Sequence, residues 1–300
     1  MMKSFIFDMY GYYSKDEGHE FDLNGWHFCL ESIKDLTESE VASLDEFVVA
    51  LSSNFQNAGV KIIKNRNQIY ISRDDKGEVV LVAYKIKDFP IQDLIKMHHI
   101  YEGIESKEPY KISYLIALWE EKVNSIKEKI IPSLKMDDYF YYKIMVCVIN
   151  SIGLANNAIQ YLAELKIDFD DEIIPLTLTH RRIKDLSTSS LFDPLNFVLD
   201  SPVRDLAEIY KEKIVTSKEL INLLGQYKID VKQASLLLAR ILFPTTIFDL
   251  LEEHYLYRND VKNKIMRYYH DLKEYIKEIK YIEKELVRRY GIRPITWLEK

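Results

Sequence analysis

The apolar positions of this chain follow one spacing before Pro90 and another after it. Before Pro90, short apolar and aromatic runs alternate with glycines and polar turns, a pattern typical of strands. One stretch is an exception, because apolar residues recur there at helical spacings of three and four. These residues are Val41, Leu44, Val48, Leu51 and Phe55. We therefore predict several strands and one helix, which starts near Glu38 and stops at Gly59.

The strands of this first part are predicted from their aromatic and apolar residues and from the glycines and turns that separate them. Between Lys3 and Ile33 the aromatic pattern, punctuated by glycines, predicts two or three strands. Residues 60–63, 68–73 and 78–86 predict further strands, the last two joined by a turn at residues 74–77. A sheet with a single helix makes an α+β lobe, which we expect to end near residue 88.

The remainder of the chain has mainly helical periodicity. A central segment at residues 173–205 is the exception, where we expect short strands and loops. The predicted helices cover residues 91–105, 111–131, 137–165, 203–213, 217–228, 230–242, 245–257 and 259–290. Prolines mark most of their boundaries, as expected of a residue that cannot donate a hydrogen bond inside a helix. Because no repeat or low-complexity linker interrupts the chain, we expect the two parts to pack together.

Composition indicates a soluble, globular protein. The 300 residues are 47% hydrophobic and 29% charged, enough to bury a core. The net charge of −6 argues against a nucleic-acid partner, which needs a basic surface. Cys29 and Cys147 stand far apart in apolar settings, so we expect neither a disulfide nor a zinc site.

Charge interrupts the N-terminus too early for a signal sequence, and no apolar run reaches the roughly 18 residues that a membrane span needs. A cytoplasmic protein without membrane contact is expected.

The central segment has the layout of a kinase active site with altered chemistry. In kinases, the Asp of a His-x-Asp loop accepts the proton of the attacking hydroxyl, and a later Asp holds Mg²⁺ against the phosphates. Here His180 is followed by Arg181 and Arg182, so Arg182 takes the position of the catalytic Asp. A guanidinium accepts no proton, and it cannot act as a general base. Loss of a general base typically lowers a rate by about 10²- to 10⁴-fold.

The metal-binding positions of this layout are also altered. Ser187 stands where a metal-binding Asn is expected, and its neutral hydroxyl is a poor substitute. Asp193 falls where the metal-binding Asp is expected, and it would be the metal ligand if an activity survives. One carboxylate alone makes a weak Mg²⁺ site, because Mg²⁺ relies on several oxygen ligands.

The first lobe offers no better phosphate site. Residues 81–85 imitate the Val-Ala-Ile-Lys strand of protein kinases, but Lys85 follows the lobe's helix, whereas a phosphate-binding Lys should precede it. Residues 25–34 form the strand in the expected position, and its centre carries no Lys. The glycine spacing does not match a phosphate-cradling loop.

Several segments carry a resemblance to a known family. They are residues 178–183 (Leu-Thr-His-Arg-Arg-Ile), 200–208 (Asp-Ser-Pro-Val-Arg-Asp-Leu-Ala-Glu), 239–249 and 118–122. Taken in their order along the chain, these segments resemble the YutH-type spore coat-associated proteins, which are relatives of the CotS group within the kinase-like, aminoglycoside phosphotransferase superfamily. The resemblance implies a bilobal protein-kinase-like fold. Its small antiparallel-sheet N-terminal lobe would cover residues 1–88, and its helical C-terminal lobe residues 89–300.

The resemblance also implies a place and a set of partners. We expect the protein in the cytoplasm of the mother cell and then in the spore coat, with spore coat proteins as partners. The substitutions at Arg182 and Ser187 indicate a pseudokinase with a structural or interaction role and no cofactor. The alternative is a divergent small-molecule phosphotransferase that uses ATP and Mg²⁺ with Asp193 as metal ligand. A scaffold that binds nucleotide without turnover is a third hypothesis.

Other residues of the motifs are expected to be structural. Arg204 and Asp205 open a helix and are expected to cap it and anchor it to the core, and His180 is expected to support its loop internally. The adjacent His98 and His99 point about 100° apart on a helix, so a shared metal is disfavoured. Four lysines follow one face of the last helix, as either a solvated edge or a docking site for an acidic coat partner. They are Lys273, Lys277, Lys280 and Lys284.

Overall fold

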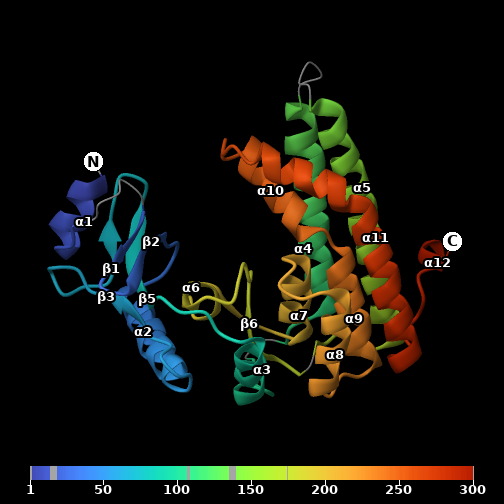
Figure 1. The fold of residues 1–300 in the computed structure, drawn as a ribbon, viewed down its shortest axis with the longest axis horizontal. Coiled ribbons are helices and arrows are strands. Elements are labelled where there is room, and N and C mark those ends of the chain that lie inside the picture. Colours follow the sequence, from blue (N-terminus) through green and yellow to red (C-terminus); the bar gives the residue numbers. More distant parts are fainter. Residues whose placement is uncertain (1, 14–18, 107–108, 135–139, 174, 300) are drawn as a thin grey trace. The chain divides into compact units, whose positions relative to one another are not determined.

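The computed structural model describes residues 2–13, 19–106, 109–134, 140–173 and 175–299, and these form two compact units. The first unit contains residues 1–100 together with 180–198, and the second contains residues 101–179 together with 199–300. Figure 1 shows the elements of both. The predicted division into lobes at residues 88 and 89 stays a prediction.

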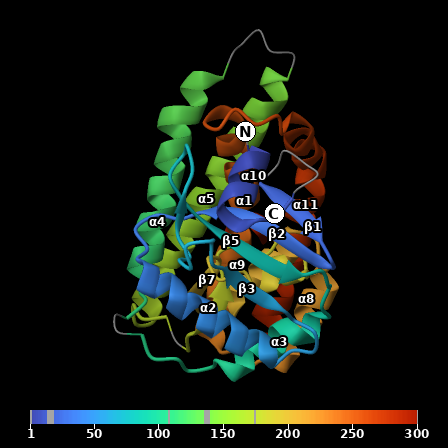
Figure 2. The same cartoon turned by 90° about the vertical axis from the view of Figure 1, so that its left-hand side faces the viewer.

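The first unit is built on an antiparallel sheet with strand order β1-β2-β5-β3, in which β4 also pairs with β5. Figure 2 shows these strands side by side. Their bounds are β1 Glu20–Leu23, β2 Trp26–Ser32, β3 Val60–Ile63, β4 Ser72–Arg73 and β5 Glu78–Lys85. Helix α2, Glu38–Ser53, connects β2 to β3. It begins at a capping box in which Thr37 and Glu40 each accept from the other's backbone N–H.

Of the two or three strands predicted between Lys3 and Ile33, the described residues form two, β1 and β2, and the start of this stretch is a helix that the pattern did not predict. This helix is α1, Met2–Tyr10. Its residues Ile6 and Tyr10 are buried in one apolar cluster with Phe21, Phe28 and Leu81 of the sheet. Ile6 and Tyr10 are four residues apart, which places them on one face of a helix, and burial of that face outweighs the strand propensity of its aromatic residues.

Strand β4 is shorter than predicted because a side chain competes for its backbone. The Glu38 carboxylate accepts hydrogen bonds from the backbone N–H groups of Tyr70, at 2.5 Å, and Ile71, at 3.1 Å. These donors are therefore taken by the start of α2 and not by a neighbouring strand. Gln68 lies in the left-handed region, with φ of 64°, which also interrupts an extended chain.

Residues 180–198 attach to the first unit through backbone hydrogen bonds. Phe89 donates to the carbonyl of Leu186 at 2.8 Å, and Thr188 donates to that of Lys87 at 2.9 Å. Helix α6, Thr188–Leu191, follows, and the ring of Phe192 then packs 5.1 Å from that of Phe89. The unit also contains helix α3, Ile91–Ile100.

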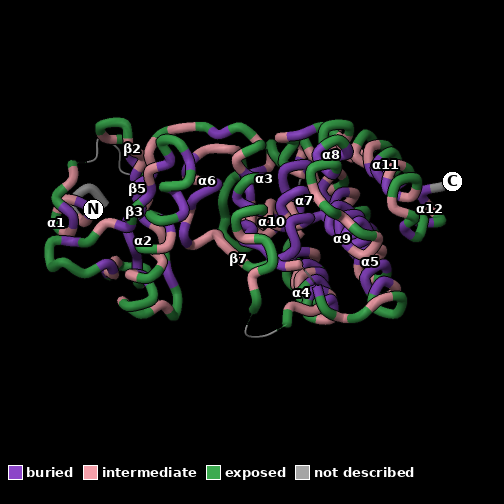
Figure 3. The backbone as a smooth tube through the Cα atoms, turned by 90° about the horizontal axis from the view of Figure 1, so that it is seen from below, coloured by how far each residue is buried: buried purple, intermediate pink, exposed green. Residues whose placement is uncertain are grey.

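The second unit is helical and has α9 at its centre. All residues from Gln233 to Leu242 of α9 are buried, which appears as the purple run of α9 in Figure 3. Helices α5, α7 and α11 pack against it, and α4 packs against α5. Two short strands, β6 and β7, form a separate sheet. The bounds are α4 Ile112–Ser125, α5 Tyr141–Asp168, β6 Thr177–His180, β7 Phe197–Asp200, α7 Val203–Lys211, α8 Ser217–Leu223, α9 Val231–Leu242, α10 Thr245–Tyr255, α11 Lys262–Tyr290 and α12 Thr296–Glu299. A π-helical turn, Ile126–Ile130, and a 3₁₀ turn, Ile131–Ser133, follow α4, and a second 3₁₀ turn, Leu224–Gln226, follows α8.

Two stretches of this unit are long and apolar enough to cross a membrane by length and composition alone. One covers α9 and α10, and 78% of its apolar window is buried inside the protein, as in the core helix of a soluble domain. The other is α5, where 44% of the apolar window is buried. The sequence-based expectation counted unbroken apolar runs and passed over these two helices. Absence of membrane contact stays a prediction.

Candidate functional site

His180 ends β6 and is fully buried. Its Nε2 donates to the carbonyl oxygen of Leu191 at 3.0 Å, and its ring lies 5.3 Å from that of Phe197. Because a carbonyl oxygen only accepts, this bond places the proton on Nε2. The ring thus connects the start of the loop after β6 to the end of α6, an arrangement that fits the expected supporting role.

Arg182 lies in a backbone clamp made by a residue that the sequence did not single out. The side-chain oxygen of Asn196 accepts from the backbone N–H of Arg182 at 3.1 Å, and its Nδ2 donates to the Arg182 carbonyl at 2.6 Å. The Nη1 group of Arg182 donates to the carbonyl of Arg181 at 2.8 Å. An amide side chain can donate and accept at once, which suits it to hold both backbone polar groups of one residue. Asn196 follows Asp193 by three residues, in the turn that leads into β7.

Ser187 caps a helix in this structure. It is the N-cap residue of α6, and its Oγ accepts from the backbone N–H of Ser190 at 3.3 Å. The same oxygen lies 3.0 Å from the Oγ of Ser189. Ser is among the residues preferred at an N-cap because its oxygen satisfies a free N–H of the first turn. Its hydroxyl is therefore already used where a metal-binding Asn would be expected.

Asp193 carries a partly buried carboxyl group near the side chains of Glu31 and Tyr84, which belong to the sheet of the first unit. Its Oδ1 accepts from the backbone N–H of Leu195 at 2.9 Å, which closes a tight turn. Burial first, and then the charge of Glu31, raise the pKa of Asp193 to about 6. The Leu195 N–H, the Tyr84 hydroxyl and His180 oppose this rise. The Tyr84 hydroxyl is itself buried and meets no partner at hydrogen-bond geometry among the described residues.

The sheet face next to Asp193 is acidic. Strand register places Glu20 opposite Cys29, Asp22 opposite His27, and His27 opposite Tyr84, so these residues share one face. Glu31 lies on the same face, two residues after Cys29. Burial, together with Glu31 and Glu20, raises the pKa of the Cys29 thiol. His27 lies on the same face, and its Nδ1 is 2.7 Å from the Oδ1 of Asp22, at hydrogen-bond distance.

Lys85 lies on the opposite face of this sheet. Lys85 pairs with Trp26, whereas Tyr84 pairs with His27, and successive strand residues point to opposite sides. Its side chain therefore leaves the sheet on the side away from Asp193.

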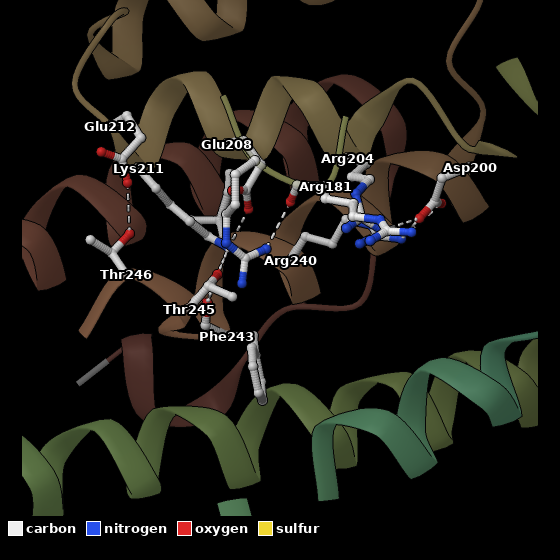
Figure 4. A network of polar contacts seen from close by, with 12 residues as sticks. Arg181, Asp200, Arg204, Glu208, Lys211, Glu212, Arg240, Phe243, Thr245 and Thr246 are labelled. Carbon is white, nitrogen blue, oxygen red and sulfur yellow. Dashed lines mark hydrogen bonds and ion pairs between the residues drawn. The ribbon is translucent and has the colours of Figure 1, made fainter. Parts of the chain in front are cut away.

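In the second unit, the Asp-Ser-Pro-Val-Arg-Asp motif forms a buried ion cluster around Asp200. The Asp200 carboxylate is fully buried and accepts two hydrogen bonds from Nη2 of Arg240, at 2.6 and 2.8 Å. Arg204 donates to the same carboxylate at 2.9 Å. Figure 4 shows Asp200 and Arg204 at one end of this polar network. One carboxylate thus links the end of β7 to both α7 and α9.

Arg204 and Asp205 lie inside α7 and are not its cap. The helix begins at Val203, and its N-cap, Pro202, makes no side-chain cap bond. Arg204 anchors the helix through Asp200. Asp205 is fully buried in the first turn. The pKa of Tyr227 is raised mainly by the burial of Tyr227 and secondly by the charge of Asp205. At the far end of α7, Lys211 donates to Thr245 of α10 at 2.7 Å, as Figure 4 shows.

The whole sequence was then compared with known proteins. The family model described as "Spore coat putative kinase YutH" matches residues 1–288, nearly the full length. The chain belongs to this family. The Endospore coat-associated protein YutH of Bacillus subtilis is 28% identical over 159 residues, which cover 49% of this chain. The match spans 44% of the length of that relative.

Solved structures show that this YutH-family chain has a kinase-like fold. An aminoglycoside phosphotransferase from Alicyclobacillus acidocaldarius is 8% identical, with a TM-score of 0.57 over 91% of this chain and 92% of the other. A spectinomycin phosphotransferase solved with ADP and spectinomycin is 12% identical, with a TM-score of 0.52 and coverage of 91% and 92%. The predicted family and the predicted α+β, kinase-like fold are confirmed.

The residues of the YutH-family chain do not fit the Mg²⁺ site that this fold implies. Burial and Glu31 raise the pKa of Asp193 to about 6, so its ionised form is less favoured than that of an exposed Asp, and its Oδ1 already accepts from the Leu195 N–H at 2.9 Å. Among the described residues, no group of three or more His, Cys, Asp or Glu side chains could hold a metal ion. The geometry assigns structural contacts to His180 and Ser187, and no reaction step follows through a metal here.

The two remaining surface features of the sequence lie in helices. His98 is buried in α3 and His99 is exposed, in agreement with their divergent directions. The four lysines of α11 are all exposed, and Lys277 pairs with Glu274 at 2.8 Å. Docking of this lysine face to a partner stays a prediction.

Proposed function

We propose that this protein is a catalytically degenerate kinase-like component of the bacterial spore coat, with a structural or interaction role. The proposal depends on Arg182, which follows His180 where the sequence pattern predicts the catalytic Asp, and the contacts of Asn196 with the Arg182 backbone support it. Arg stays protonated at any working pH and accepts no hydrogen bond. It cannot take a proton from an attacking hydroxyl group.

The surroundings of Asp193 support the same proposal. Kinases bring the triphosphate to the metal-binding Asp, with Mg²⁺ neutralising the charge between them. Here Asp193 lies beside Glu31, on a sheet face that also carries Glu20 and Asp22. A nucleotide phosphate on this face would meet carboxylates of its own charge. The repulsion between like charges close together in a protein amounts to several kcal/mol at short range.

The place of action is proposed from the relative. YutH of Bacillus subtilis is named as an endospore coat-associated protein. We propose the same association for this chain, with synthesis in the cytoplasm of the mother cell and spore coat proteins as its partners. Nucleic acid and membrane are not among the proposed partners, in line with the net charge of −6.

A thermal-unfolding assay with nucleotide tests the proposal. A ligand that binds only the native state raises its stability by RT ln(1 + [L]/Kd), about 2.7 kcal/mol at a hundred times Kd. We expect Mg·ATP, Mg·ADP and Mg²⁺ alone to leave the melting temperature of the full chain unchanged.

The Asp193→Ala variant is the control for this assay. A melting temperature that rises with Mg·ATP in the native chain, and does so no longer in Asp193→Ala, would overturn the proposal. That result would favour a divergent phosphotransferase with Asp193 as metal ligand. A rise that persists in Asp193→Ala, without transfer of phosphate to any acceptor, would instead indicate a nucleotide-binding scaffold.

A further inference from the structure

Helix α5 presents to solvent a face that is almost free of charge. From Ile144 to Ala163 the helix contains no Asp, Glu, Lys or Arg, although 29% of the whole chain is charged. Tyr142 is 71% exposed, Ile149 61% and Ile167 83%. Exposed helix faces normally carry charged residues, and a row of large exposed apolar side chains marks a contact site.

The residues of this face recur at alternating steps of four and three. The series is Tyr142, Val146, Ile149, Gly153, Asn156, Gln160, Ala163 and Ile167. All are exposed except Val146, which is half-buried. This is the a/d spacing of a coiled-coil seam, and it lies on the outer side of α5, away from the residues that pack on α9 and α11. We call these eight residues the outer seam.

Gly153 lies at the middle of the outer seam and has no packing reason to be a glycine within the chain. A Cβ atom built on it would meet no atom within 4 Å. Glycine inside a helix costs about 1 kcal/mol relative to alanine. Glycine at this place allows another helix to approach closely, and no contact among the described residues makes use of this.

The outer seam is complementary to itself when two copies run antiparallel. With the two-fold axis between Leu154 and Ala155, Tyr142 faces Ile167 of the second copy and Val146 faces Ala163. Ile149 then faces Gln160, and Gly153 faces Asn156. Large residues meet at both ends, and the glycine meets an amide at the centre. We propose that this protein forms a two-fold symmetric dimer through α5.

The residues that flank the seam agree with this pairing. In an antiparallel helix pair, equivalent flanking positions face each other across the axis. Lys143 then faces the second copy's Glu164, and Asn150 faces its Asn157. On the other flank, Ile152 faces Ile159. Opposite charges, two amides and two half-buried aliphatic side chains thus lie opposite each other, with Glu164 also paired to Arg293 of its own chain at 2.9 Å and Lys166 opposite Met145.

A second copy fits this face better than lipid does. Asn150, Asn157 and Gln160 each donate to a group of their own helix, but hydrocarbon offers no donor to the side-chain oxygens of these amides or of Asn156. Across the two-fold axis Asn150 meets the amide of Asn157, while Asn156 and Gln160 lie opposite Gly153 and Ile149 beside the aqueous rim of the helix pair. The seam from Tyr142 to Ile167 is about 37 Å long at 1.5 Å per residue. A single pair of helices of this length lies at the small end of specific interfaces, so we expect a dimer that dissociates on dilution.

Sedimentation of the full chain over about a hundredfold range of concentration tests the dimer. We expect the native chain to pass from monomer to dimer, and Gly153→Glu to stay monomeric with an unchanged or higher melting temperature. The matched control is Gly225→Glu, because a Cβ atom at Gly225 also meets nothing within 4 Å. It should dimerise like the native chain. A native chain that stays monomeric throughout, or that sediments with phosphatidylglycerol vesicles as a monomer, would overturn the proposal.

Crosslinking tests the direction of the helices. In an antiparallel dimer Tyr142 lies next to Ile167 of the second copy, and about 37 Å from that copy's Tyr142. A short bismaleimide should therefore link Tyr142→Cys to Ile167→Cys when the two variants are mixed, in a Cys29→Ser background, and should link neither variant to itself. Crosslinks within a single-variant sample would mean parallel helices and would refute the two-fold arrangement. Neither test depends on nucleotide binding or on the spore coat, so each can fail while the proposed function holds.

Discussion

Asp193 shows how one residue type can keep its place in a motif while its surroundings change its chemistry. A carboxylate that binds a metal must be ionised and open to the ion. Here burial and the neighbouring Glu31 raise the pKa of Asp193 to about 6, and its Oδ1 accepts from Leu195. The residue has become part of a turn. Arg182, Ser187 and Asn196 show the same tendency, since each is engaged in a backbone contact of the loop.

The raised pKa of Asp193 makes a prediction about stability and pH. The native carboxyl has a pKa of about 6, above the value of 3.8 that applies to the unfolded chain. The native state thus binds the proton more tightly, and this stabilisation is complete below about pH 4 and is lost as the pH rises through 6. Asp193→Asn imitates the protonated form. We expect it to raise the free energy of unfolding at pH 7.5 by about 1 to 3 kcal/mol.

The pH dependence distinguishes this effect from a general gain in stability. Urea unfolding of the native chain and of Asp193→Asn at pH 4 and pH 7.5 should show the gain at pH 7.5 only. Asp75→Asn, at an exposed turn position, serves as the control and should show no gain at either pH. A gain of equal size at both pH values would contradict the assignment of the effect to the charge.

At the scale of elements, the short connections hold the central segment together. Strand β7 ends at Asp200, and the next helix starts three residues later. The buried carboxylate joins both of them to α9 through Arg204 and Arg240. Helix starts elsewhere use local devices, such as the capping boxes at Thr37, Thr216 and Asp230. These boxes can be recognised in the sequence, whereas the ion cluster joins residues 40 positions apart.

The ion cluster predicts a large loss of stability for one substitution. Asp200→Asn leaves the buried guanidinium group of Arg240 and the half-buried one of Arg204 without their carboxylate. Removal of one partner from a buried ion pair typically costs about 3 to 5 kcal/mol, because the remaining charge stays desolvated. Chemical denaturation monitored by far-UV circular dichroism should show a loss of this order.

Asp249→Asn provides the comparison for Asp200→Asn. Asp249 pairs with Lys122 at 3.0 Å, but its side chain is 40% exposed. Exposed pairs contribute about 1 kcal/mol or less, so this variant should remain close to the native chain. Equal effects of the two substitutions would show that the cluster around Asp200 does not organise the segment.

At the scale of the whole molecule, the chain combines a kinase-like fold with exposed surfaces that lie outside the central segment. The family match covers residues 1–288, whereas the altered site occupies a short central segment. The outer seam of α5 and the lysine face of α11 lie outside that segment. If the fold serves as a scaffold, its surfaces and not its former catalytic loop should decide its association with the coat.

Localisation of fluorescent fusions in a sporulating host tests this division of roles. We expect the double variant Arg182→Ala, Asp193→Asn to reach the spore coat like the native chain, because neither residue is proposed to act chemically. Reversal of Lys273, Lys277, Lys280 and Lys284 to Glu should abolish coat association, since all four are exposed and would meet an acidic partner. The opposite pattern would contradict the scaffold proposal.

The sequence by itself determined most of the helices of the second unit and the altered positions of the loop. Apolar residues at spacings of three and four predicted α9 within one residue at its start, and residues 60–63 were predicted as a strand and form β3. The identities of Arg182 and Ser187 needed no coordinates. These features are local, because they follow from side-chain spacing or from the chemistry of a single residue.

Only the tertiary structure decided which distant residues meet. Residues 3–10 form a helix because Ile6 and Tyr10 bury against the sheet, although their aromatic neighbours favour a strand. The role of Asn196, the cluster around Asp200 and the acidic surroundings of Asp193 each join residues separated by loops or whole elements. Burial and desolvation, which set the pKa of Asp193 and fix Asp200 in place, depend on the packed protein and not on neighbours along the chain.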